Sequence, residues 1–278
     1  LKARFDEDNN IQWAKQLEQA GIHVVYGILG FKTHTKIALV VRKEKGRLRN
    51  YFHIGTGNYN SNTSRFYTDI GLLSTDPDIS SDLIELFNYL SGFSKQKTYQ
   101  KLLVSPTSLR KKFIFLINRE IENAKKGEKG EIIAKMNSLV DPEIIQLLYL
   151  ASQTGVKIHL IIRGICCLYP QRKNLSENIK VTSIIGHFLE HSRIFWFHNN
   201  NNSEVFIGSA DWMRRNLDRR IEAVTPIEDI KLKSQLYNLL QIYIDDNYYS
   251  WVMNKDGVYE KKKEDSNLNR SQIDLIKN

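Results

Sequence analysis

One ordered set of short motifs occurs twice in this 278-residue chain, and this repetition constrains the fold more than any other feature. In each half, a helical pattern runs into a glycine that opens an apolar stretch. A histidine with a basic residue two positions later follows, and a glycine-containing segment then closes a strand pattern. The first copy comprises Gly21, His34-Thr35-Lys36 and Gly55-Thr56-Gly57-Asn58, and the second Gly155, His191-Ser192-Arg193 and Gly208-Ser209-Ala210-Asp211. We infer an old duplication, with extra residues in the second copy between glycine and histidine.

Alternation of helical and extended patterns predicts an α/β sandwich in each half. We expect a first domain over residues 1–101, a second over 102–253, and a disordered tail over 254–278, where apolar residues are few. The predicted strands cover residues 1–3, 22–27, 35–41, 51–54, 132–135, 157–162, 192–197 and 204–207. The predicted helices cover residues 10–20, 79–90, 108–125 and 142–152.

The chain is basic, with 40 Lys and Arg against 31 Asp and Glu and a net charge of +9. A surface of this charge favours polyanions, which include nucleic acid, anionic lipid, nucleotide and polyphosphate. No apolar run approaches 18 residues and no signal peptide is apparent, so we expect no integral membrane segment. The start at Leu1 favours a fragment of a longer protein. The only cysteines, Cys166 and Cys167, are adjacent and therefore poor partners for a disulfide, which favours a reducing cytosol.

The two histidine motifs carry the chemistry that the sequence offers. On an extended strand, residues two apart face the same side, so His34 would lie beside Lys36 and His191 beside Arg193. A neutral imidazole is available as a nucleophile near pH 7, and the cation would neutralise phosphate oxygens. A lone pair of this kind is usually a solvated sheet face, but its repetition favours one site in which one histidine attacks phosphorus and the other acts as acid, base or phosphate ligand.

Two familiar phosphate-binding motifs are absent. The segment Gly30-Phe31-Lys32-Thr33 ends like a Walker loop, but Val25 occupies the position where that motif requires its first glycine. The glycine loop and catalytic residues of protein kinases are also missing. The small residues of the two glycine-containing segments would instead let backbone N–H groups approach a phosphate.

Six segments together are similar to the bacterial polyphosphate kinase family, over roughly residues 1–253. They are Leu1-Lys2-Ala3-Arg4-Phe5-Asp6-Glu7, Lys32-Thr33-His34-Thr35-Lys36, Gly55-Thr56-Gly57-Asn58-Tyr59-Asn60, Arg163-Gly164-Ile165-Cys166-Cys167, Glu190-His191-Ser192-Arg193 and Gly208-Ser209-Ala210-Asp211-Trp212. The resemblance implies two tandem phospholipase D-like domains, each a mixed sheet flanked by helices, in a pseudo-twofold arrangement. It also implies reversible transfer of the γ-phosphate of ATP onto inorganic polyphosphate through a phosphohistidine.

The resemblance assigns roles to individual residues. His34 takes the position of the phosphorylated histidine, and His191 that of the second active-site histidine, which contacts the nucleotide phosphates. Tyr67 and Arg163 match positions that bind ATP. Arg4 matches a position associated with Mg²⁺, and because a guanidinium has no lone pair, we expect it to clamp phosphate-bound Mg²⁺. We also expect Lys36, Arg193 and Asn58 to contact phosphate.

The sequence departs from the phospholipase D signature at one position of each copy, and two functions other than phosphoryl transfer stay open. The phospholipase D signature has an Asp some five residues after its lysine, where Val41 and Arg42 stand in the first copy and Phe197 and His198 in the second. A phospholipase D-like phosphodiesterase and a non-catalytic polyanion-binding module remain as alternative functions. The family's amino-terminal regions precede Leu1, so the fragment alone is expected to be inactive. The implied partners are ATP, ADP and polyphosphate, with no nucleic acid. We expect a homo-oligomer that forms through those amino-terminal regions. The expected location is the cytoplasm, with peripheral association with a membrane as an alternative.

Overall fold

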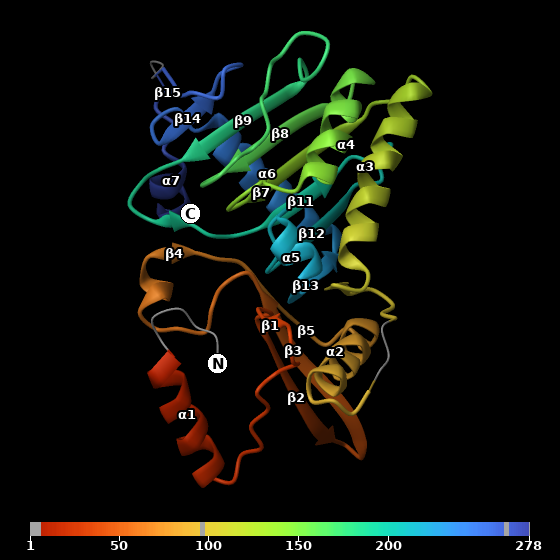
Figure 1. The fold of residues 1–278 in the computed structure, drawn as a ribbon, viewed down its shortest axis with the longest axis vertical. Helices are drawn as coiled ribbons and strands as arrows, with labels where there is room; N and C mark the ends of the chain where they lie inside the picture. The colour runs from red at the N-terminus through yellow and green to blue at the C-terminus, as the bar shows by residue number, and fades with distance from the viewer. Residues whose placement is uncertain (1–6, 95–97, 264–266, 278) are drawn as a thin grey trace.

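The computed structural model describes residues 7–94, 98–263 and 267–277. A smaller first half and a larger second half lie end to end along the long axis of the molecule (Figure 1). The predicted strand over residues 1–3 and the predicted site residue Arg4 lie outside the described residues. Among the described residues, no helix combines the length and the apolarity needed to cross a lipid bilayer.

The second half contains most of a ten-stranded mixed sheet. Its strand order is β1-β13-β12-β11-β7-β8-β9-β14-β15, with β6 paired to β13, and β7, β8 and β9 run parallel to one another. The strands are β1 (Lys32–Thr33), β6 (Leu103–Ser105), β7 (Glu131–Met136), β8 (Lys157–Ile162), β9 (Ile179–Ile184), β11 (Ile194–Phe197), β12 (Glu204–Gly208), β13 (Arg220–Ile227), β14 (Ser250–Met253) and β15 (Tyr259–Lys261).

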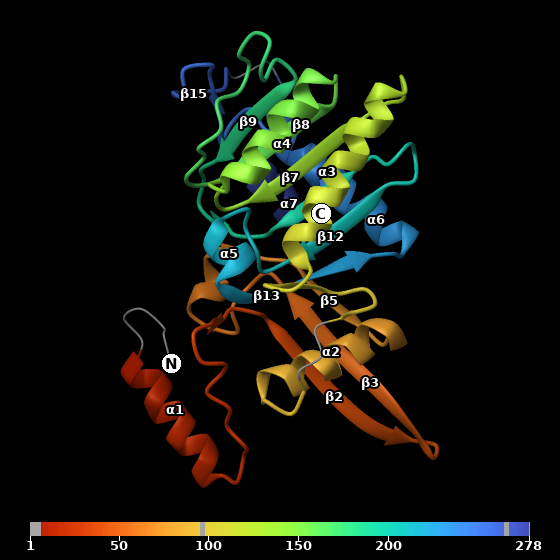
Figure 2. The same cartoon turned by 45° about the vertical axis from the view of Figure 1, so that its right-hand side comes forward.

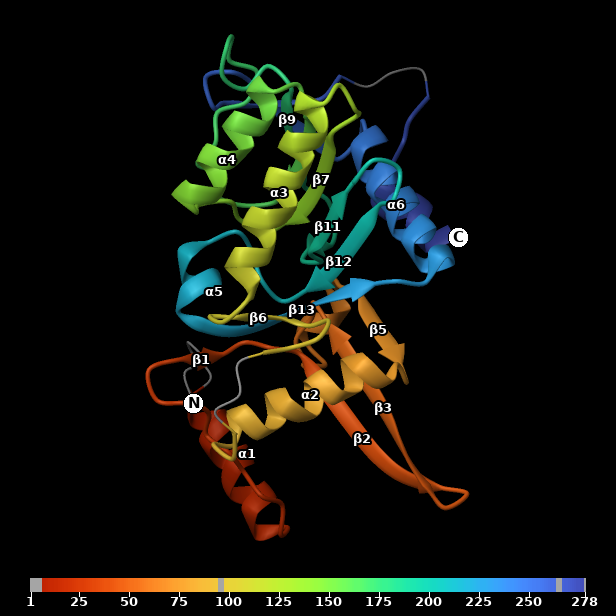
Figure 3. The same ribbon diagram turned by 90° about the vertical axis from the view of Figure 1, so that its right-hand side faces the viewer.

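Helices cover both faces of this sheet, as Figure 3 shows. Helices α3 (Leu109–Lys125) and α4 (Pro142–Gln153) pack on one face, and α6 (Ile230–Asp245) packs on the other. Strand β11 shows why the sequence permits this: Phe195 and Phe197 enter the core under α3 and α4, while Ile194 and Trp196 enter the core under α6. Because successive side chains point to opposite faces, a strand buried on both sides is apolar throughout.

The first half is built on a three-stranded antiparallel sheet of β2 (Ile37–Glu44), β3 (Arg47–Gly55) and β5 (Gly71–Ser74). Helix α2 (Pro77–Leu90) covers one face and buries Leu83 and Leu86 against Phe52 and Ile54. Asp76 caps this helix by accepting hydrogen bonds from the first-turn backbone. Helix α1 (Glu7–Gln19) stands apart from the sheet in Figure 2, and Ala14 is its one buried residue.

Two very short parallel pairings join the halves. Strand β1 of the first half pairs with β13 of the second, and β10 (Leu189–Glu190) of the second half pairs with β4 (Tyr67–Thr68) of the first. The remaining elements are the 3₁₀ turn η1 (Thr63–Arg65), α5 (Arg214–Asp218) and α7 (Ser271–Lys277). The halves therefore exchange a short strand in each direction.

The expected fold class is confirmed: the chain is α/β, with sheets flanked by helices in two units. The four predicted helices correspond to α1, α2, α3 and α4, with ends that differ by up to three residues. The predicted strand over residues 22–27 is wrong, because that segment is irregular coil between α1 and β1. Its apolar alternation has no neighbouring strand to pair with, and Val25 and Tyr26 stay exposed.

The structure also corrects the prediction of a disordered tail over residues 254–278. In its described part, β15 pairs with β14, and α7 packs against the body of the second half. Ile273 and Leu275 contact the core beneath α6. The side chain of Gln272 bonds the backbone of Phe188 in both directions. Two apolar side chains and one well-placed amide are enough to dock this otherwise polar segment.

Candidate active site

His34 lies directly after β1, at the point where the first half crosses to the second. The parallel register pairs Thr33 with Ile221, and the backbone N–H of His34 donates to the Ile221 carbonyl over 2.8 Å. This places His34 beside Glu222, whose Oε2 lies 2.9 Å from the imidazole Nδ1. The Glu222 side chain is fully buried, so the carboxylate of one half fixes the histidine of the other.

His191 has the reciprocal arrangement. It follows β10, the register pairs Glu190 with Thr68, and the His191 backbone N–H donates to the Thr68 carbonyl over 3.2 Å. Its Nδ1 lies 2.8 Å from Oδ1 of Asp69. Each histidine is therefore held by a carboxylate from the opposite half, and the duplication inferred from sequence reappears as an exchange across the interface.

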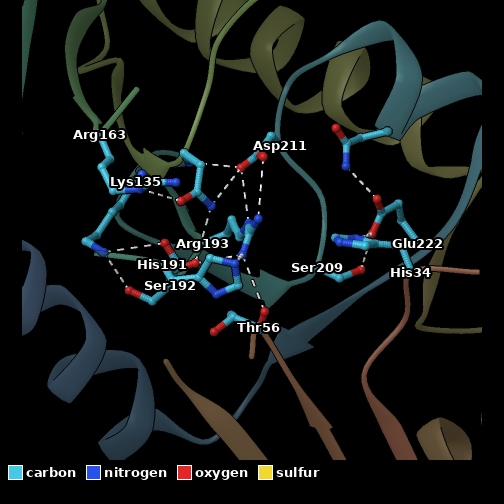
Figure 4. Close-up of polar contacts among 12 residues, drawn as sticks. His34, Thr56, Lys135, Arg163, His191, Ser192, Arg193, Ser209, Asp211 and Glu222 are labelled. Atoms are coloured by element: carbon cyan, nitrogen blue, oxygen red, sulfur yellow. Dashed lines mark hydrogen bonds and ion pairs between the residues drawn. The ribbon is translucent and has the colours of Figure 1, made fainter. Parts of the chain in front are cut away.

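The two glycine-containing segments position these carboxylates. The Thr56 hydroxyl donates to Asp69 over 2.6 Å, and the Ser209 hydroxyl donates to Glu222. Thirteen residues separate hydroxyl and carboxylate in both copies. A Cβ on Gly57 would lie 2.5 Å from the Asp69 side chain, which explains the need for glycine there. Figure 4 shows His34 grouped with Glu222 and Ser209 on one side of the site.

This geometry differs from the role expected for the segments' backbone. The N–H groups of Thr56 and Ser209 already donate to the carbonyls of Ile70 and Ala223, over 2.9 and 3.0 Å. They continue the strand ladder and do not face an open phosphate site. Asn58, the last residue of the first segment, has an exposed side chain. Asp211, at the matching position of the second copy, is buried and forms an ion pair with Arg193.

The basic residues of the two motifs are buried and point back to their own histidines. Lys36 is 4% exposed, and its ammonium donates to the His34 carbonyl. Burial lowers the pKa of Lys36 to about 8. Arg193 is 3% exposed, donates to the His191 carbonyl over 2.7 Å, and forms an ion pair with Asp211 over 3.1 Å. The structure therefore brings both pairs into one site, although neither cation lies on an open strand face.

Tyr67 and Arg163 lie around His191. The Tyr67 and His191 ring centroids are 5.0 Å apart. Arg163 follows the end of β8, and its Nε donates to Oδ1 of Asn137 over 2.9 Å. Burial lowers the pKa of Arg163, and its guanidinium forms no ion pair with a described residue, which suits an anionic ligand.

Sequence reasoning missed several residues of this site. Asp69 and Glu222 could have been found, because their common spacing from Thr56 and Ser209 is part of the repeat. Lys135 offered a weaker signal as the lone cation in the apolar strand β7. It is 1% exposed, lies 3.0 Å from Glu190, donates to the Ser192 hydroxyl over 2.7 Å, and so supports the residues on either side of His191.

The histidines are set up as neutral bases. Burial lowers the pKa of His34, against the opposing effect of the hydrogen bond that the ring donates to Glu222, and burial likewise lowers the pKa of His191 against the effect of Asp69. With the Nδ1 proton directed at a carboxylate, the lone pair of each ring lies on Nε2. Among the described residues, no cluster of three His, Cys, Asp or Glu side chains could hold a metal ion. Asp69 and Glu222 each contact one histidine ring.

Two α/β units, each with a sheet flanked by helices, form the phospholipase D-like fold, which this chain shares with solved structures. The phosphatidylserine synthase of Haemophilus influenzae Rd KW20 shares this fold alone: it is 10% identical, with a TM-score of 0.50 over 82% of this chain and 66% of that one. The crystal structure of the polyphosphate kinase of Porphyromonas gingivalis is much more similar, with a TM-score of 0.92, 38% identity, and coverage of 100% of this chain and 42% of that one.

Sequence comparisons agree with this. The family models described as polyphosphate kinase C-terminal domain 1 and C-terminal domain 2 match residues 1–96 and 102–272. Polyphosphate kinases of Parasynechococcus marenigrum (strain WH8102) and Prochlorococcus marinus (strain MIT 9313) are 63% and 64% identical over 100% and 99% of this chain. The chain belongs to the polyphosphate kinase family. It spans 39% of the length of each of these two relatives.

Proposed function

We propose that the protein containing this chain transfers the γ-phosphate of ATP reversibly onto inorganic polyphosphate, with His34 as the phosphate carrier. The observation that carries the proposal is the state of the His34 ring. Its Nδ1 is held by the buried carboxylate of Glu222, and no described residue forms a hydrogen bond with its Nε2. The family relatives, which are polyphosphate kinases by name, support the same reaction.

In the first step, the Nε2 lone pair of His34 attacks the γ-phosphorus. An N–P bond forms, the P–O bond to the β-phosphate breaks, and ADP leaves with that electron pair. The ring retains its Nδ1 proton, and the positive charge that develops on it faces Glu222. In the second step, a terminal oxygen of polyphosphate attacks the same phosphorus, and the N–P electron pair returns to Nε2.

Cations around the ring would stabilise the charge that spreads over the transferring phosphoryl group. Lys36 and Arg193 are within the site, and Arg163 is held through its Nε by Asn137. We assign Tyr67 and Arg163 to the nucleotide. The described residues offer cations for phosphate and no carboxylate cluster for metal, so Mg²⁺ would enter as part of the magnesium–nucleotide substrate and be held by its phosphates.

The test is labelling of the complete protein with γ-labelled ATP, followed by acid treatment. The wild-type protein should acquire an acid-labile, base-stable label and then transfer it to polyphosphate. His34→Ala should abolish the label while nucleotide binding persists. Label that survives this substitution, or hydrolysis of a phosphodiester in place of transfer, would contradict the proposal.

A further inference from the structure

The two histidines of the site differ at Nε2, the atom that would attack phosphorus. In His191, Nδ1 faces Asp69 over 2.8 Å, and Nε2 lies 3.1 Å from Nη1 of Arg193 (Figure 4). A guanidinium carries donors and no acceptor, so Nε2 must accept the hydrogen bond. The lone pair of His191 is therefore occupied by a charged N–H group.

Among the described residues, no hydrogen bond reaches the corresponding lone pair of His34. Nδ1 faces Glu222 in the same way, but Lys36 donates to the His34 carbonyl and not to the ring. The two copies thus share the carboxylate that sets the tautomer and differ in the cation beside the ring.

The chemistry of the two cations explains the difference. A lysine ammonium is one compact charge, and Lys36 uses it on the backbone. The planar fork of Arg193 reaches the His191 carbonyl at 2.7 Å, the His191 ring at 3.1 Å and Asp211 at 3.1 Å at the same time. The buried Asp211 holds the fork in this orientation, and the first copy has the exposed Asn58 at that place.

We propose that Arg193 masks Nε2 of His191 and thereby confines phosphoryl transfer to His34, leaving His191 as a latent second nucleophile. The inference rests on the proposed function and adds a positioning residue that decides which histidine is phosphorylated. For His191 to form an N–P bond, the charged hydrogen bond to its lone pair must first break. The cost of breaking it slows attack by roughly ten- to a hundred-fold, so label on His191 should stay below detection over the short time in which wild-type His34 is labelled.

The experiment converts the second copy to the residues of the first in the complete protein. Arg193→Lys and Asp211→Asn together give the second copy the lysine and the asparagine of positions 36 and 58, so no buried aspartate is left unpaired. Both are added to His34→Ala, and acid-labile label from γ-labelled ATP is measured. His34→Ala alone should carry no label. The triple variant should carry label that disappears when His191→Ala is added.

Lys36→Arg in the otherwise native protein supplies an independent test, because it places a guanidinium beside His34. It should slow labelling of His34 by roughly ten-fold or more. Label on His191 while Arg193 is intact would overturn the inference. So would an unlabelled triple variant whose melting temperature still rises with ATP, or unchanged labelling of Lys36→Arg. Failure of the proposed function is distinguishable, since the wild-type protein would then carry no label on His34.

Discussion

Replacement of Glu222 by glutamine tests whether the exchanged carboxylate drives chemistry at His34. The substitution keeps the shape of the side chain and its contacts with Ser209 and Asn216, but removes the charge that faces the imidazole. The charge becomes important when the N–P bond forms, because the ring then becomes cationic. A glutamine amide can also donate to Nδ1, which would move the ring proton to Nε2 and remove the attacking lone pair.

The distance sets the magnitude. Unit charges 2.9 Å apart interact with about 6 kcal/mol at an effective dielectric constant of about 20. Part of this is retained by the amide dipole, so we expect the barrier to phosphorylation to rise by roughly 3–5 kcal/mol. The rate of labelling should therefore fall by roughly 10²- to 10⁴-fold.

Single-turnover labelling of the complete protein with γ-labelled ATP measures this rate directly. Glu120→Gln is the matched control, because Glu120 is also fully buried and accepts backbone hydrogen bonds from Asn199 and Glu131 outside the site. It should leave the rate within a few-fold of wild type. If Glu222→Gln labels as fast as Glu120→Gln, the carboxylate only supports the fold and the reasoning is refuted.

Two further predictions follow from the site and its supports. The rate of labelling should persist below pH 6.5, because burial lowers the pKa of His34 and keeps it neutral there, and should fall above about pH 8 as Lys36 loses its charge. A profile of kcat/KM that still climbs through pH 8 would contradict this. Gln272→Ala removes the bonds to Phe188 and Glu190 and should lower the free energy of unfolding by about 1–3 kcal/mol. Ile276→Ala, at an exposed position of the same helix, should change it by less than about 0.5 kcal/mol. Thermal melts that do not separate these two variants would show that the helix does not hold the His191 segment.

The helices and the longer strands could be predicted because their signals are local. The apolar period of α3 and the unbroken apolar run of β11 each reflect burial against a core that lies within one half. Strands β1, β4 and β10 contain two residues each, which is too short for a period of two to be visible. Their pairing depends on the opposite half, so it could not be read from either half alone.

The residues of the candidate site also differ in whether their signal is local in sequence. His34 and His191 could be predicted because the repeat places a cation two residues after each. Their carboxylates come from the other half and are separated from them by 188 and 122 residues in sequence, which conceals the contact. What could have been used is the spacing of Asp69 from Thr56, which equals that of Glu222 from Ser209.

This exchange makes the active site a property of the pair of units and not of either copy. In a separate first half, the Nδ1 of His34 would face water, and either tautomer of its ring would be populated. In a separate second half, Glu222 would retain the bonds to Ser209 and Asn216 but would have no base to hold. Because each half supplies the charge that the other requires, divergence was free to act on the remaining difference, the cation beside each ring. With arginine in the second copy, Nε2 of His191 accepts a hydrogen bond from Arg193. With lysine in the first copy, the cation bonds the His34 carbonyl and leaves Nε2 of His34 available, in an otherwise symmetric site.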